Sequence, residues 1–124
     1  MKPLFRSGMK PLIPSRIAEI IFALVFIVFG ILHFKNAGAM GHGVPSYMPG
    51  DGKIYIYLTG AVMILAGIGI IMVFHKTLLC YLLAAVLIIF VLAVHLKPAM
   101  DGNLTNFLKD TAMAMGAIII GNRK

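Results

Sequence analysis

Two histidines and one aspartate are the residues of this chain whose types and positions could do chemistry. His33 and His95 each lie near the end of a long apolar segment, and each is followed two residues later by a lysine, Lys35 or Lys97. Asp110 lies inside another apolar segment. An imidazole gains or loses a proton near neutral pH, and a neighbouring carboxylate can hold its tautomer. These residues would therefore suit hydrogen bonding or proton transfer to a small ligand.

Other interpretations of the same residues stay open. Two histidines and a carboxylate could bind a metal ion, and paired histidines on different helices can ligate a haem iron. In a purely structural interpretation, an Asp–His or Asp–Lys bond locks the helices together, and His and Lys anchor the segment ends. Arg16 and Glu19, about one helical turn apart, are expected to form a structural pair at the cytoplasmic interface.

The composition indicates that these residues are positioned within a lipid bilayer. The chain has 124 residues, of which 60% are hydrophobic and 12% charged, with a net charge of +7. In a soluble protein this charge would suggest nucleic acid, but here the basic residues gather at segment ends, where anionic headgroups explain them. We therefore expect the bilayer as a partner and no nucleic acid. The single cysteine, Cys80, allows neither an internal disulfide nor a dithiol relay.

Four apolar stretches predict four transmembrane helices, at about residues 16–34, 54–74, 77–96 and 104–121. Each is long enough to cross a hydrocarbon core of about 30 Å. A backbone in lipid must satisfy its own hydrogen bonds, which favours helices. The expected fold is an all-α, four-transmembrane-helix bundle that forms a single membrane domain over residues 1–124, with an outer loop at 35–53.

The basic residues also predict the orientation. Seven lie on the side of the N-terminus: Lys2, Arg6, Lys10, Arg16, Lys76, Arg123 and Lys124. Four lie on the other side: Lys35, Lys53, Lys97 and Lys109. Because cytoplasmic segments carry the excess of Lys and Arg, both termini are expected inside the cell.

Helical periodicity predicts which residues face the interior, where small and polar side chains of membrane helices usually lie. The first segment has a stripe of Glu19, Ala23, Phe26, Gly30 and His33, and the third has Cys80, Ala84, Leu87, Val91 and His95. The fourth has Asn103, Asn106, Asp110, Ala114, Ala117 and Gly121. We therefore expect an outer-leaflet polar pocket, with Asp110 within hydrogen-bond distance of a histidine and Lys35 and Lys97 at the rim. Lys109 is expected to extend to the headgroups.

Several short motifs over residues 16–98 resemble the DoxX-like family of small four-helix membrane proteins. They are Gly30, His33 and Phe34 in the first segment, Val44, Pro45 and Pro49 in the loop, Thr59 and Gly60 in the second segment, and His95 in the third. The family often has a glutamate where this chain has Met63. Chemistry that needs a carboxylate at that position would have to use Asp110 instead.

The resemblance implies a multi-pass protein of the inner (plasma) membrane of a prokaryote. The family takes its name from a subunit of an archaeal thiosulfate:quinone oxidoreductase, and other members are linked to oxidative-stress complexes. We therefore expect an accessory subunit of a membrane redox system, with a quinone or another small amphiphile as ligand, no cofactor of its own and a redox partner subunit. Catalysis by the isolated chain is not expected. The alternative is a non-catalytic assembly or interaction protein whose polar cluster only locks helix packing. The oligomeric state stays open.

Overall fold

The computed structural model describes residues 12–123, and this part of the chain is all-α, without strands. The long helices are α2 (Ser15–Lys35), α4 (Gly52–Met72), α5 (Lys76–Phe90) and α7 (Thr105–Asn122). The short ones are α3 (Ala37–Met40), η1 (Gly41–Gly43), η2 (Val91–His95) and α6 (Leu96–Met100). Lys2, Arg6, Lys10 and Lys124, which contribute to the predicted orientation, lie outside the described residues. The predicted fold class is confirmed at the level of an all-helical protein.

Three helical segments are long and apolar enough to cross a membrane: Ser15–Lys35, Gly52–Met72 and Lys76–Met100. The last of these combines α5, η2 and α6. Large apolar side chains such as Ile21, Leu24 and Val28 are exposed along α2, as expected for a surface in contact with hydrocarbon. α7 carries Lys109 and Asp110, is less apolar, and is not among the three.

The second apolar segment begins and ends two residues earlier than expected. α4 begins at Gly52 because the Asp51 side chain caps the helix by accepting a hydrogen bond of 3.0 Å from the Lys53 backbone N–H. It ends at Met72, where Val73 and His75 adopt left-handed backbone conformations. The turn over residues 73–75 therefore makes α4 and α5 antiparallel neighbours.

The third segment continues past its expected end at residue 96. Residues Val91–His95 form a wider π-helical turn, and α6 then runs to Met100. Pro98 has no N–H to donate to the Val94 carbonyl, and its ring would crowd that carbonyl in a regular helix. A wider turn before the proline relieves this crowding, and such turns are frequent at functional sites.

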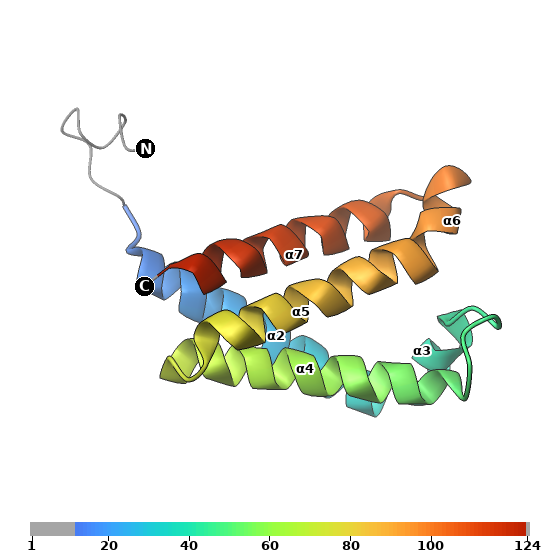
Figure 1. Cartoon of the computed structure of the whole chain (residues 1–124), viewed down its shortest axis with the longest axis horizontal. Helices are drawn as coiled ribbons and strands as arrows, with labels where there is room; N and C mark the ends of the chain where they lie inside the picture. The colour runs from blue at the N-terminus through green and yellow to red at the C-terminus, as the bar shows by residue number, and fades with distance from the viewer. Residues whose placement is uncertain (1–11, 124) are drawn as a thin grey trace.

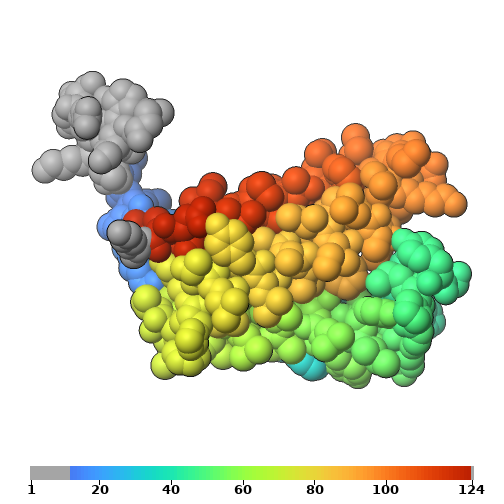
Figure 2. Space-filling view, viewed as in Figure 1, coloured from blue at the N-terminus to red at the C-terminus, as the bar shows by residue number. Residues whose placement is uncertain are grey.

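The expected outer loop contains α3 and η1, followed by an irregular stretch up to Asp51. The Tyr47 hydroxyl donates a hydrogen bond to the Ala93 carbonyl in η2. This bond fastens the loop to the Val91–Met100 end of the third segment, where the two surfaces meet in the space-filling view (Figure 2).

Helix packing follows two close pairs. α2 packs mainly on α4, α5 packs on α7, and α4 lies beside α5 (Figure 1). The expected inward stripes of α2 and α5 are confirmed: Glu19, Ala23, Phe26 and Gly30 are buried on α2, and Cys80, Ala84 and Leu87 on α5. The stripe expected in the fourth segment is buried on α7 from Asp110 to Gly121, but its two asparagines are exposed: Asn106 on α7, and Asn103, which precedes the helix.

Adding one methyl group to Gly30 is expected to destabilise the pair formed by α2 and α4. A Cβ at this position would lie 2.7 Å from the Gly60 carbonyl oxygen and 2.5 Å from Ile64 Cγ1. Because the carbonyl belongs to the backbone, the helices would have to separate. Gly30→Ala should lower the free energy of unfolding by about 1–3 kcal/mol, measured by denaturant titration in mixed micelles. Gly38→Ala, where a Cβ meets open space, is the control. Equal stability of the two variants would contradict the prediction.

Candidate functional site: a cavity between the helices

A cavity of about 460 Å³ lies among the long helices, at the end of the molecule that carries both candidate histidines. Much of its wall is apolar, with contributions from Phe29, Ile56, Met63, Leu87, Phe90 and Met113. Its polar groups come from His33, Asn36, Thr59, His95, Asn106, Lys109 and Asp110. The volume and the few polar groups within a largely apolar lining are typical of small-molecule sites.

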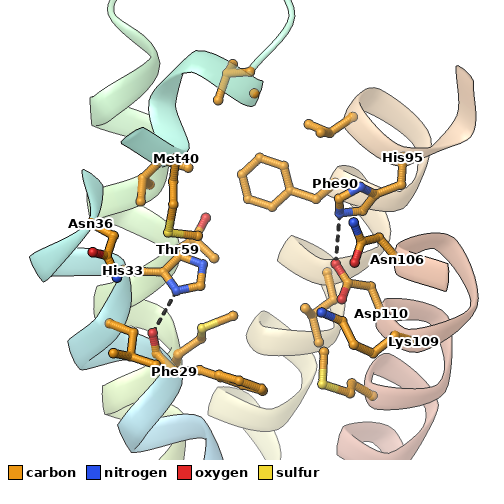
Figure 3. Close-up of a pocket in the computed structure, with 18 residues that line it drawn as sticks. Phe29, His33, Asn36, Met40, Thr59, Phe90, His95, Asn106, Lys109 and Asp110 are labelled. Carbon is orange, nitrogen blue, oxygen red and sulfur yellow. Dashed lines mark hydrogen bonds and ion pairs between the residues drawn. The ribbon is translucent and has the colours of Figure 1, made fainter. Parts of the chain in front are cut away.

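Asp110 and His95 are in contact across two helices. Asp110 Oδ2 lies 3.1 Å from His95 Nε2, and both side chains line the cavity (Figure 3). The contact joins η2 to α7 and orients the imidazole. The prediction that Asp110 lies within hydrogen-bond distance of a histidine, beside a cavity, is confirmed.

His33 lies on the opposite wall of the cavity and is held by its own helix. Its Nδ1 lies 2.7 Å from the Phe29 carbonyl oxygen, one turn earlier in α2. A carbonyl accepts a hydrogen bond, so Nδ1 carries the proton and Nε2 of the neutral ring keeps a free lone pair. Figure 3 shows His33 on the α2 side and His95 on the α5–α7 side, with the cavity between them.

The lysines of the cavity differ from those that the sequence suggested. Lys35 and Lys97 are exposed and are not among the residues that line the cavity. Two residues correspond to about 200° of helical rotation, so a lysine two positions after an inward histidine faces away. Lys109 lines the cavity instead, although we expected it to extend to the headgroups. Figure 3 shows its long side chain reaching back from α7 toward the space between the walls.

Met63 lies in the wall of the cavity. Its side chain is almost fully buried and contributes to the cavity lining. Among the lining residues, Asp110 is the only acidic one. Any proton chemistry in this cavity that needs a carboxylate would therefore depend on Asp110.

The cavity lies where α2 and α7 diverge. At the other end of these helices, Glu19 contacts Arg123, and Gly116 packs so closely on Phe22 that a Cβ would lie 3.1 Å from the ring. Toward the histidines the two helices separate (Figure 1), and the cavity lies between them. Asn36 on one side and Asn106 and Lys109 on the other are exposed lining residues, which indicates an opening between α2 and α7.

The outer loop covers part of the cavity, and Tyr47 fastens it. Met40, Gly43 and Val44 line the cavity. Three residues after Val44, the Tyr47 hydroxyl donates a hydrogen bond to the Ala93 carbonyl.

Tyr47→Phe removes one hydrogen bond, worth about 1 kcal/mol net, so the loop should open about fivefold more often. Hydrogen–deuterium exchange of residues 40–48 would measure this opening, with Tyr57→Phe as the control. Unchanged exchange would show that the bond does not hold the loop.

A second polar cluster lies at the opposite end of the molecule, around the buried carboxylate of Glu19. Glu19 Oε1 lies 3.4 Å from Arg16 Nη1 and 4.0 Å from Lys76 Nζ, and its other oxygen binds Arg123 Nε. The expected contact between Arg16 and Glu19 is present. The sequence analysis missed Lys76 and Arg123 as further partners, because Arg123 is 104 residues away from Glu19 and no local pattern connects the two.

The fold and the cavity together define an all-helical protein with three candidate membrane spans and, among its long helices, a largely apolar cavity that carries a few polar side chains. Residues 22–119 match the family described as a domain of unknown function, DUF8561, and the chain belongs to this family. No curated protein matches the chain significantly. No solved structure does so either.

Proposed function

We propose that all four long helices cross the inner membrane of a prokaryote, with both termini in the cytoplasm and the cavity in the outer leaflet. Asp110 is buried and Lys109 lines the cavity, so the charged residues of α7 need not face lipid. The exposed face of α7, which includes Leu108, Met115 and Ile119, is apolar. This arrangement supports α7 as a fourth span, in agreement with the excess of basic residues on the side of the termini.

We propose that the cavity binds a small amphiphile, with a quinone as the candidate, and that the chain serves as an accessory subunit of a membrane redox system. The observation that carries the proposal is the presence of His33 and His95 on facing walls of a largely apolar cavity. A neutral His33 Nε2 could accept a bond from a quinol hydroxyl, and Lys109 or Asn106 could donate to a quinone carbonyl. Electrons would come from the partner subunit. The resemblance to DoxX-like proteins supports the same proposal.

The second candidate function is a non-catalytic assembly or interaction protein. The contact between His95 and Asp110 favours it, because this contact joins η2 directly to α7. Among the described residues, every buried side-chain nitrogen or oxygen also has a hydrogen-bond partner. A cluster whose only role is to hold the helices together would show both features.

Binding of a quinone analogue tests the two candidates. We expect the purified protein in nanodiscs to bind decylubiquinone saturably, and His33→Ala to weaken this binding about tenfold, as for a lost hydrogen bond plus lost contacts. His42→Ala is the control, since His42 is exposed in η1 and lies outside the cavity lining. Circular dichroism would verify that each variant keeps its helices. Absence of saturable binding by the unmodified protein would contradict the proposal and favour the assembly role.

A further inference from the structure

The end of the molecule opposite the cavity carries more positive than negative charge. Glu19 is the acidic residue at this end, since the chain has four and the others are Asp51, Asp101 and Asp110. Its carboxylate is shared by Arg16, Lys76 and Arg123. Arg16 has further partners, because it also donates hydrogen bonds to the Ile70 and Ile71 carbonyls at the end of α4. Lys76 and Arg123 are therefore left to share one carboxylate.

Lys76 forms no hydrogen bond with any residue that the structure describes, and although most of its side chain is buried, its Nζ still reaches the surface. Its side chain is 8% exposed, and its Nζ lies 4.0 Å from Glu19 Oε1, which is too long for a hydrogen bond. A lysine ammonium has three donors, and here they are available to a group bound in the surface depression that Lys76 lines. Lys76 is also the first residue of α5, where free backbone N–H groups add partial positive charge. A bound anion would satisfy both sets of donors.

The surface around Lys76 combines this charge with apolar side chains. A shallow depression is lined by His75, Lys76, Thr77 and Arg123, together with Val73 and Leu78. Val73 and Leu78 are each more than half exposed. A cationic pocket at the end of membrane helices, flanked by exposed apolar side chains, suits a phospholipid, whose phosphate and chains need both features. A free anion from solution would interact only with the charged groups and would leave the apolar side chains uncovered.

We propose that this depression binds the phosphodiester group of an anionic phospholipid of the phosphatidylglycerol class. The phosphate lies between Lys76 Nζ and the guanidinium of Arg123, whose Nε is occupied by Glu19 while its terminal amino groups remain as donors. The acyl chains lie along Val73 and Leu78. This site is separate from the cavity; it rests on the proposed placement of the helices in the membrane, and not on the ligand proposed for the cavity.

Lipid competition in nanodiscs tests this proposal. The full-length protein is placed in nanodiscs of phosphatidylglycerol and phosphatidylcholine in equal amounts, and native mass spectrometry measures which lipid stays bound. The unmodified protein should retain phosphatidylglycerol preferentially. Lys76→Gln and Arg123→Gln should each lower this preference about fivefold, the effect of one cation near a lipid headgroup. Lys53→Gln removes the same charge at the other end of the molecule and should leave the preference unchanged.

Several outcomes would overturn the proposal. One is an unmodified protein without any preference for phosphatidylglycerol, and another is an equal loss of preference in Lys53→Gln. Displacement of the lipid by excess inorganic phosphate would identify a site for free phosphate instead. If circular dichroism shows that Lys76→Gln has lost its helices, the proposal is tested with Arg123→Gln instead. The dependence of the phosphatidylglycerol preference on salt, measured with the unmodified protein, is the second test. A preference that does not weaken as salt increases would contradict binding through these charges.

Discussion

Replacing Glu19 with glutamine is expected to lower the free energy of unfolding by roughly 3 kcal/mol, at the low end of the cost of breaking a buried ion pair. The substitution leaves Lys76 buried without a counter-charge and removes the carboxylate that joins α2 to α5 and α7. The larger part of the loss should come from Lys76, since the Arg16 and Arg123 side chains are 38% and 44% exposed and their contacts are screened by solvent.

Denaturant titration in mixed micelles would measure this loss, with Asp101→Asn as a control that removes an exposed carboxylate. The double variant Glu19→Gln/Arg123→Gln should be more stable than the sum of the single effects predicts, because the two side chains interact directly. If the two single effects on the free energy of unfolding simply added in the double variant, or if the Glu19 variant were as stable as the control, the cluster would not hold the helices together.

Replacing Asp110 with asparagine is expected to weaken the binding of a quinone analogue about tenfold, because the loss of the carboxylate contact leaves the His95 ring less well oriented. Asparagine has nearly the same shape, so the helices should keep their packing. Asp110 acts here as a positioning residue through its contact of 3.1 Å with His95 Nε2.

Two measurements distinguish this role from helix locking. Binding of decylubiquinone in nanodiscs gives the change in affinity, and nitrogen NMR of the histidine ring reports the tautomer of His95. In the unmodified protein the proton should lie on Nε2, and in Asp110→Asn it should be shared between both nitrogens. Asp101→Asn should change neither. An unchanged affinity with a changed stability would assign Asp110 to helix packing alone.

The sequence predicted the helices and their inward faces well because both depend on local properties. The continuous apolar stretches determine where a helix is stable in lipid, and the rotation of about 100° per residue determines which residues share a face. The buried stripe on α2, from Glu19 to Gly30, follows from these two rules. The same rules correctly placed His33, His95 and Asp110 around one cavity, because each residue lies on an inward face near the same end of the molecule.

The remaining features depend on contacts between distant parts of the chain, and for that reason they were decided by the tertiary structure. Arg123 reaches Glu19 only because α2 and α7 converge at one end, and Lys109 lines the cavity because these helices diverge at the other. Lys35 and Lys97 were expected at the rim from their nearness to the histidines in sequence, but helical rotation turns them away. Local composition thus determines which segments are helices and which residues lie inside, whereas the crossing of the helices decides which inside residues meet.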